Sequence, residues 1–408
     1  MSSALPQKRH PRLGPRPLGL HLTTALYASL SLPIAWRSLK SASTNLNPEA
    51  QARLQNLLGL GASPEFEAAV AQEAIARARR FIAGIKFYQH APIRRTLPSA
   101  PIIWQAGTTC LRDYNPQQPD AAVILVIPSL INRFDILDLD KDGSFLRALA
   151  EQGFRPLVVD WDAPGEEENT FSLTDYIVKR LVPTLDIATN RGARRIHILG
   201  YCMGGLLALA LAVLNPGHTR TLTLMATPWD FHRPDPSIGV QFTAIMDHIE
   251  PQLEKIGQLP VDFIQSLFAL FQPMQVFSKF VAAASMDPAA RETRQFILLE
   301  DWLNDGVPLV AQVARECLRG WYGENQPGQM AWSIADRIVD PRQLNIPAYV
   351  LVPGKDRIVP PESALPLTKL LPHATLHEPM LGHIGLIASR NAPAQVWAPL
   401  FHWLGKHK

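Results

Sequence analysis

The sequence predicts an α/β fold with a mostly parallel central sheet, because short apolar runs alternate with helical patterns through most of the chain. The runs are too short and too uniformly apolar to be exposed helices, so we expect them to be buried parallel strands. These expected strands lie at residues 122–127, 156–159, 195–199, 221–225 and 348–352. Helices are expected between them at residues 144–152, 173–189 and 204–214.

Length and composition are typical of a folded globular protein. The 408 residues, 47% hydrophobic and 18% charged, can bury a sizeable core. The formal net charge is only +3 and much of the basic excess lies near the start of the chain, so no folded face is expected to bind nucleic acid. Cys110, Cys202 and Cys317 are widely separated and lack metal-ligand spacing. They predict no disulfide framework, no metal site and a reducing, cytoplasmic compartment.

We expect five segments along the chain. Residues 1–20 are predicted to be a disordered basic tail, and residues 21–100 an N-terminal helical extension. Residues 101–230 and 341–408 are expected to form the two parts of the α/β core. Residues 231–340 are aromatic-rich and mainly helical in pattern, which predicts a cap over the carboxyl ends of the sheet. An ordinary helical subdomain would carry the same aromatic residues in its core.

An apolar stretch from Leu18 to Trp36 follows the basic start of the chain. Its polar interruptions, beginning with His21, and the lack of a small-residue cleavage pattern fit neither a secretory signal nor a transmembrane helix. We expect an amphipathic helix that packs on the domain rather than one that rests on an apolar surface.

The sharpest motif is the G-x-C-x-G run from Gly200 to Gly204, with Cys202 at its centre. It directly follows an expected strand and opens an apolar helix, which is the arrangement of a nucleophile elbow. The elbow places its central residue at the carboxyl edge of the sheet, and the helix N-terminus favours a thiolate there. We therefore predict an α/β-hydrolase fold with Cys202 as the nucleophile, although most isolated cysteines are small buried hydrophobes.

A thiolate nucleophile needs a base, and this fold supplies its partners in the order nucleophile, acid, histidine. Asp356 follows the expected strand at residues 348–352, where a carboxylate can reach a loop histidine. His383 lies within the run Gly382–Gly385, whose glycines permit a tight loop that aims the imidazole ring. We therefore predict a triad of Cys202, Asp356 and His383.

Other residues compete for the acid and base roles. Asp336 and Asp340 precede the strand that should carry the acid, which disfavours them. The remaining candidate bases, which we expect in strands or at the surface, are His197, His373, His377, His402 and His407.

The oxyanion hole is expected to use two backbone amides. One is the N–H of Met203, directly after the nucleophile. The other should come from the loop that follows the strand ending at Ile127. Ile131 is our preferred donor in that loop, with Leu130 next.

With these residues in place, the chain resembles the polyhydroxyalkanoate synthases, whose catalytic domains are α/β-hydrolase folds with a cysteine in the elbow. The resemblance extends from about Val123 to Arg390, roughly two thirds of the chain. It rests on the segments Leu130–Leu139, Val159–Trp161, Leu173–Ile177, Gly200–Gly205, Thr227–Phe231 and Gly382–Gly385.

The resemblance implies that Cys202 is acylated by a hydroxyacyl-coenzyme A thioester, that His383 is the general base and that Asp356 orients it. It further implies a growing polyester chain as acceptor, no cofactor, a homodimer or a partner subunit, and a cytoplasmic location that includes the polyester granule surface. The chain departs from the family pattern at Arg357, where the family usually has histidine. We expect this side chain to point outward, because the neighbouring Asp356 must face His383.

The residues leave the reaction open between two enzymes. A polyester synthase passes the acyl group to a chain-end hydroxyl, whereas a cysteine-dependent hydrolase, such as a depolymerase, esterase or thioesterase, passes it to water. A catalytically idle granule-associated protein is a third alternative. The intact set of Cys202, Asp356 and His383 argues against it.

Overall fold

The computed structural model describes residues 12–41, 48–60, 64–190 and 195–408. The chain divides into two compact units. The first comprises the chain up to Arg94 together with Gln265–Asn304, and the second comprises Arg95–Ile264 and Asp305–Lys408. None of the helices in the described residues has both the length and the apolar character needed to cross a membrane.

The first unit is helical. Its helices are α1 (Leu18–Ser41), α2 (Pro48–Leu60), α3 (Pro64–His90), α10 (Gln275–Ala283) and α11 (Arg291–Asn304), while α9 (Val261–Phe271) runs from the second unit into the first. Aromatic residues of α3 and α10 form most of the core, and the rings of Phe81 and Phe280 meet edge to face with centroids 6.2 Å apart. Ala25 brings α1 into the same core, so the helix expected from Leu18 packs on the protein.

The segment before α1 belongs to the first unit, which corrects the disordered tail expected over residues 1–20. Residues 1–11 of that tail lie outside the described residues. The Arg12 guanidinium bonds both oxygens of Asp301, with Nη2 2.7 Å from Oδ2, and also donates to two backbone carbonyl oxygens. Because Asp301 lies 289 residues further along the chain, no local pattern could have indicated this anchor.

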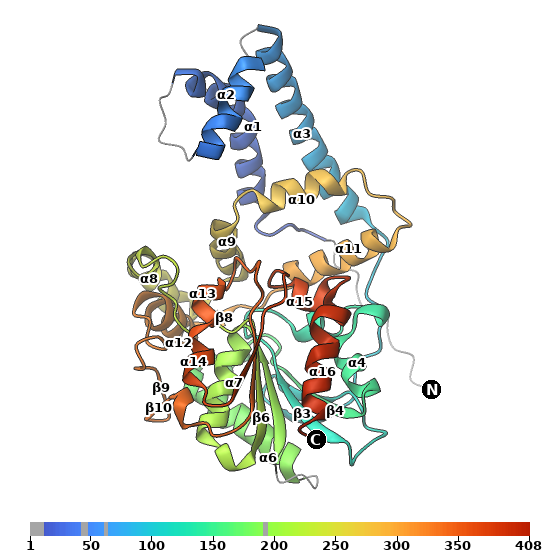
Figure 1. Ribbon diagram of the computed structural model, residues 1–408, viewed down its shortest axis with the longest axis vertical. Coiled ribbons are helices and arrows are strands. Elements are labelled where there is room, and N and C mark those ends of the chain that lie inside the picture. Colours follow the sequence, from blue (N-terminus) through green and yellow to red (C-terminus); the bar gives the residue numbers. More distant parts are fainter. Residues whose placement is uncertain (1–11, 42–47, 61–63, 191–194) are drawn as a thin grey trace. The chain divides into compact units, whose positions relative to one another are not determined.

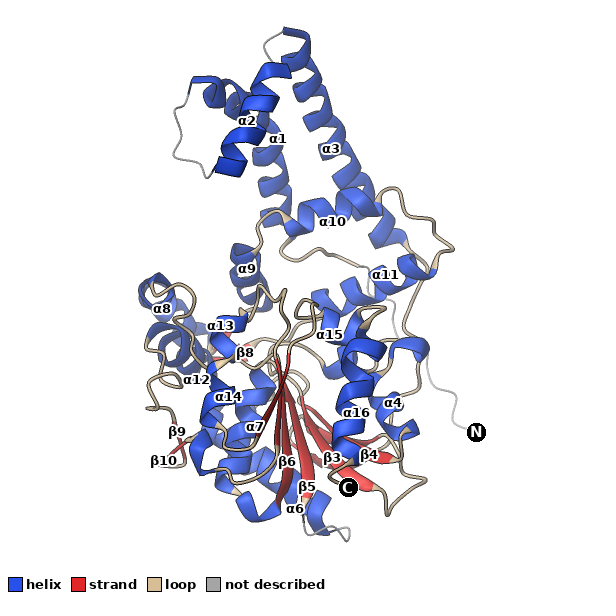
Figure 2. Ribbon diagram, in the orientation of Figure 1, coloured by secondary structure: helices blue, strands red, loops and turns tan. Residues whose placement is uncertain are grey.

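The second unit is built on one large sheet (Figure 2). Its strands in the described residues are β1 (Ile102–Ala106), β2 (Thr109–Asp113), β3 (Ala122–Ile127), β4 (Phe154–Asp160), β5 (Ile196–Tyr201), β6 (Thr219–Met225), β11 (Ala348–Leu351) and β12 (Ala374–His377), in the spatial order β1-β2-β4-β3-β5-β6-β11-β12. The pairs β1 with β2 and β2 with β4 are antiparallel. All other neighbouring strands are parallel, as expected for the α/β-hydrolase fold.

Helices cover both faces of this sheet. They are α4 (Phe145–Glu151), α5 (Leu173–Tyr176), α6 (Val182–Asn190), α7 (Met203–Leu214), α13 (Pro361–Ala364), α14 (Pro366–Leu370), α15 (Gly385–Ala388) and α16 (Ala398–Gly405). Figure 1 shows α4 and α16 on one face, with α6, α7 and α14 on the other. Residues 124–127 of β3 are fully buried between these layers, which explains why the strand is apolar without alternation.

Residues 231–340 interrupt the core, but they do not form a single cap. Residues 265–304 belong to the first unit, because Phe277 and Phe280 pack against Phe81 of α3. The part in the second unit contains α8 (Ser237–Ile256), α12 (Ala311–Arg315), a π-helical turn (Glu316–Gly323), and the strand pairs β7 (Gln258–Leu259) with β8 (Leu309–Val310) and β9 (Ser333–Ile334) with β10 (Arg337–Ile338).

Candidate active site

Cys202 lies at the sharp turn between β5 and α7. Its backbone angles, φ 56° and ψ −126°, fall outside the regions that non-glycine residues normally occupy. The Cys202 N–H donates to the carbonyl oxygen of Met225 on β6 at 2.8 Å, and its own carbonyl oxygen accepts from the Gly205 N–H at 2.9 Å. These bonds hold the turn, so the structure has the elbow expected from the sequence, with Cys202 half-buried at its apex.

Gly200 and Gly204 allow the elbow to pack tightly. A Cβ at Gly200 would lie 2.5 Å from the Cα of Gly205, and one at Gly204 would lie 2.6 Å from the carbonyl oxygen of Pro128. Both distances are well inside van der Waals contact, so any larger residue would displace backbone. Gly200 therefore lets the end of β5 approach the start of α7, and Gly204 lets α7 approach the loop that follows β3.

Asp356 and His383 are joined by a hydrogen bond, with Nδ1 of His383 2.7 Å from Oδ2 of Asp356. The other carboxylate oxygen accepts from the backbone N–H groups of Ile358 at 2.8 Å and Val359 at 2.9 Å. The Asp356 side chain is fully buried, so these bonds fix its orientation. With Nδ1 directed at Asp356, the other ring nitrogen of His383 is left for the nucleophile.

The imidazole of His383 also interacts electrostatically with Cys202. Burial lowers the pKa of His383, but the electrostatic interaction with Cys202, followed by that with Asp356, outweighs burial and raises the pKa to about 10. At neutral pH the folded protein therefore favours an imidazolium ion beside the sulfur. The structure thus brings together the three residues that the sequence indicated, from the elbow, the β11 loop and the loop before α15.

Tyr201 supports His383 from below the elbow, a contact that sequence reasoning missed. Its hydroxyl donates to the His383 carbonyl oxygen at 3.1 Å, and the two rings are stacked with centroids 5.3 Å apart. Burial, then the charges of Cys202 and Asp356, raises the pKa of Tyr201 well above its usual range, so the hydroxyl stays protonated and donates. The available signal was its position directly before the nucleophile.

The competing acids and bases are engaged elsewhere. Asp340 pairs with Arg342 at 2.9 Å, and Asp336 is exposed on the turn between β9 and β10. His197 lies within 2.8 Å of the Thr221 hydroxyl inside the sheet. Neither acid is hydrogen-bonded to His383, whereas Asp356 is.

The expected oxyanion-hole residues differ in whether their backbone N–H groups already have a hydrogen-bond acceptor. Met203 begins α7, so its N–H has no acceptor within the helix. The Ile131 N–H, our preferred second donor, already points to the Ser129 hydroxyl at 3.4 Å. The N–H of Leu130, the second choice, meets no protein acceptor in the part of the chain that the structure describes. Leu130 is therefore the freer donor of the two.

Tyr322, on the π-helical turn of the insertion, is a second residue that the sequence did not single out. Burial, then the electrostatic interaction with Cys202, raises the pKa of Tyr322 well above its usual range. Its ring stacks on that of Phe242, with centroids 4.3 Å apart, and packs edge to face with that of Phe231, with centroids 4.8 Å apart. Sequence reasoning treated such aromatic residues as core, and no local signal distinguishes this one.

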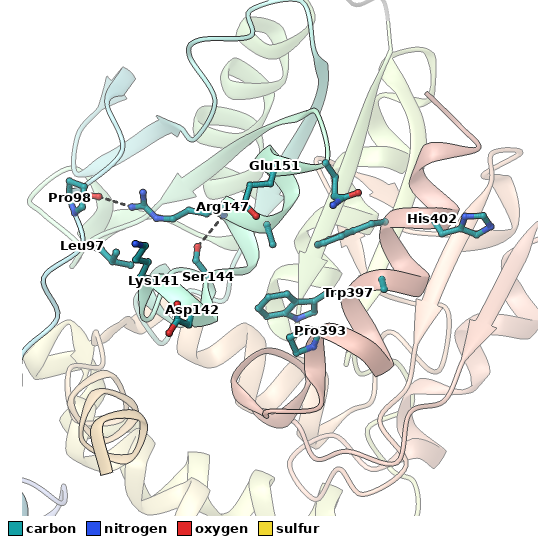
Figure 3. Close-up of a pocket in the computed structure, with 14 residues that line it drawn as sticks. Leu97, Pro98, Lys141, Asp142, Ser144, Arg147, Glu151, Pro393, Trp397 and His402 are labelled. Atoms are coloured by element: carbon teal, nitrogen blue, oxygen red, sulfur yellow. Dashed lines mark hydrogen bonds between the residues drawn. The ribbon is translucent and has the colours of Figure 1, made fainter. Parts of the chain in front are cut away.

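Arg357, the departure from the family pattern, is exposed as expected. Among the described residues, no three His, Cys, Asp or Glu side chains gather as a metal ion would require. Figure 3 shows a surface pocket lined by residues of α4, α16 and the connector before β1, and no triad residue lines it.

Comparison with known proteins identifies the fold family. Residues 123–389 match the family described as alpha/beta hydrolase fold. The chain is also similar to proteins named poly(3-hydroxyalkanoate) polymerase subunit PhaC. The protein of Haloferax mediterranei is 31% identical, and the match covers 69% of this chain and 58% of the relative. The protein of Synechocystis sp. is 26% identical, with 75% of this chain and 84% of the relative covered. The protein of Haloarcula marismortui is 28% identical, with 70% of this chain and 61% of the relative covered.

The chain therefore spans less than two thirds of the Haloferax and Haloarcula relatives and most of the Synechocystis one. The matched residues include the elbow, Asp356 and His383. The chain belongs to the α/β-hydrolase fold family.

Proposed function

We propose that the protein is a polyhydroxyalkanoate synthase-like acyltransferase that moves hydroxyacyl groups from coenzyme A thioesters to a growing polyester. The observation that carries the proposal is the cysteine at the elbow, together with a His383 that interacts with it and that Asp356 orients. The similarity to poly(3-hydroxyalkanoate) polymerases supports the choice of substrates.

In the first half-reaction the Cys202 thiolate attacks the thioester carbonyl carbon. The bond to the sulfur of coenzyme A breaks, and the His383 imidazolium donates its proton to that leaving sulfur. The raised pKa of His383 suits this step, because the imidazole enters it already protonated. The amides of Met203 and Leu130 are the donors that we assign to the carbonyl oxygen as its negative charge develops.

In the second half-reaction the neutral His383 accepts the proton of a chain-end hydroxyl. The alkoxide oxygen attacks the acyl-cysteine, and the Cys202 thiolate leaves, which restores the starting ion pair. Exchange between a thioester and a thiolate is nearly balanced in energy, so the acyl group stays reactive on the enzyme. A sulfur nucleophile therefore fits an enzyme that passes acyl groups on.

The alternative is a cysteine-dependent hydrolase, in which water replaces the chain-end hydroxyl. The triad geometry is the same for both reactions, so the acceptor decides between them. We propose the synthase because the relatives that match the chain are named polymerases. Their naming as subunits also supports a partner subunit, and we propose that the protein lies in the cytoplasm at the polyester granule.

The proposal is tested by incubating the purified full chain with 3-hydroxybutyryl-coenzyme A, with and without a short hydroxybutyrate oligomer as primer. Free thiol and insoluble polymer are measured in the same samples. We expect thiol release accompanied by polymer, and neither product from the Cys202→Ala variant, which keeps the elbow but lacks the nucleophile. Thiol release accompanied only by free 3-hydroxybutyrate would contradict the synthase and establish the hydrolase.

A further inference from the structure

The loop after β3, which supplies Leu130 to the proposed oxyanion hole, is held at three consecutive residues by one short segment. The Ile131 carbonyl oxygen accepts from the Val307 N–H at 3.1 Å. Asn132 forms a β-bridge with Gly306, and Nε of Arg133 lies 2.9 Å from Asp305. The three contacts pair consecutive residues of the two segments in antiparallel order, so they hold the loop jointly rather than as isolated bonds.

Residues 305–307 lie where the chain returns to the second unit. The chain leaves this unit after Ile264 and re-enters it at Asp305. Gly306 lies against Val261, the first residue of α9, because a Cβ at Gly306 would lie 3.0 Å from Cγ1 of Val261. The same Cβ would lie 3.4 Å from the Ile131 carbonyl oxygen. An alanine at this position would therefore require the Val261 side chain or the Ile131 backbone to shift by a few tenths of an ångström.

Arg133 extends this arrangement to a third segment. Its Nη1 lies 2.7 Å from Oδ1 of Asp162, which follows β4 and has a φ of 54°. One guanidinium therefore links the loop after β3, the turn after β4 and the return point at Asp305. All three meet beside the loop that approaches Gly204 at the start of α7.

We propose that Arg133, Asp305 and Gly306 are positioning residues that hold the backbone of residues 130–131 where its amide can stabilise the oxyanion. The inference rests on the proposed acyl transfer at Cys202. None of the three needs to touch substrate. They act by fixing the position of this backbone amide. Loss of one oxyanion donor typically costs about a hundredfold to a thousandfold in rate, so a small displacement of the amide is expected to slow the reaction.

The first test uses two assays of Cys202 that differ in one respect. Acylation by p-nitrophenyl butyrate passes through an oxyanion and is followed by the burst of p-nitrophenolate, whereas alkylation by iodoacetamide displaces iodide and forms no oxyanion. We expect Gly306→Ala to slow acylation about tenfold and to leave alkylation unchanged. Cys202→Ala gives the background from Cys110 and Cys317 in both assays.

A compensating variant separates positioning from general damage. Val261→Ala removes the Cγ1 that the new methyl group would meet, so Gly306→Ala combined with Val261→Ala should recover most of the acylation rate. A fold that is merely destabilised by the first change would not be repaired by a second large-to-small change in the same place.

The charged contact is tested by Asp305→Asn, with Asp247→Asn as the matched control. Asp305 and Asp247 are similarly exposed, at 66% and 63%, and each pairs with one arginine at 2.9 and 2.8 Å. Exposed pairs contribute little to stability, so neither variant should unfold. We expect acylation to fall severalfold in Asp305→Asn, with alkylation unchanged and with both rates unchanged in Asp247→Asn.

Equal effects on acylation and alkylation, or no effect of Gly306→Ala on acylation, would overturn the proposal. So would a wild-type protein that is alkylated at Cys202 but releases no p-nitrophenolate. These results are distinct from failure of the proposed function. A protein that gives the expected burst pattern but releases no thiol from 3-hydroxybutyryl-coenzyme A would keep the positioning role and lose the synthase.

Discussion

The charge state of His383 depends chiefly on one neighbour. Its pKa of about 10 lies above the ordinary value of 6.5, although burial alone would lower it. The largest contribution that raises the pKa comes from Cys202. Because the folded-state pKa is the higher one, the protonated imidazole stabilises the fold fully below pH 6.5, and this stabilisation is lost as the pH rises through about 10. Acylation should decline over the same upper range, since the leaving thiolate then finds no proton.

We predict that Cys202→Ala lowers the pKa of His383, because the largest contribution that raises it is removed while burial remains. The measurement is an NMR titration of the His383 ring in the wild-type protein and in the variant. His197 is the internal control, since burial and the nearby Arg220 hold its pKa at about 3 in both. An unchanged titration of His383 would mean that Cys202 carries no negative charge beside it.

Tyr201→Phe should slow acyl transfer roughly threefold to tenfold and cost about 1 kcal/mol of stability, because it removes one hydrogen bond to the His383 backbone and keeps the ring. The control is Tyr349→Phe, which removes the bond between Tyr349 and His377 at a site remote from the triad. We expect Tyr349→Phe to lower the midpoint of thermal unfolding without lowering kcat. Equal losses of kcat in the two variants would show that Tyr201 has only a structural role.

At the scale of elements, the close packing of α3 against α10 depends on the absence of a side chain at Gly84. A Cβ at Gly84 would overlap the Phe280 carbonyl oxygen and lie 2.8 Å from its carbonyl carbon. We predict that Gly84→Ala destabilises the first unit by roughly 1–3 kcal/mol by forcing the helices apart, although alanine favours helix by about 1 kcal/mol. Gly19→Ala on α1, where a Cβ meets nothing within 4 Å, should be neutral or stabilising.

Hydrogen exchange of the α3 amides measures this effect directly. Faster exchange in Gly84→Ala than in Gly19→Ala is the expected result. If the α3 amides exchange equally fast in the two variants, the close approach at Gly84 is not what holds the helices together.

The elements that the sequence predicted well are those with a strong local pattern. β3 and β11 are buried on both faces, so an unbroken apolar run marks each of them, and the glycines around Cys202 mark the start of α7. The hairpin of β1 and β2 was not predicted, because its residues mix polar and apolar side chains without a clear period. Its pairing is fixed instead by β4, whose residues lie about fifty positions further along.

The triad was likewise accessible from sequence, because each member sits beside a recognisable strand or glycine turn. The second oxyanion donor was not, since choosing between Leu130 and Ile131 requires knowing where the Ser129 hydroxyl points. Tyr322 was inaccessible for a different reason. Its electrostatic interaction with Cys202 depends on how the insertion folds back, which no spacing along the chain encodes.

For the whole molecule, the main difference from expectation is the fate of residues 231–340. The sequence suggested one continuous cap, yet residues 265–304 share a core with α1 and α3. The core of the first unit is therefore made from two chain segments, and neither can bury its aromatic residues alone. Amphipathic helices show in sequence that they must be covered, but they do not show by what.

The meeting of Val261 and Gly306 has a consequence for chain entropy. It closes residues 265–304 into a loop whose two ends nearly touch within the second unit. The entropy of closing such a loop depends only on the logarithm of its length, so doubling the excursion adds about 0.6 kcal/mol. Helices could thus be gained, lost or exchanged in this excursion during evolution at little thermodynamic cost to the catalytic sheet. The one fixed requirement is that each new version begin and end beside the same glycine.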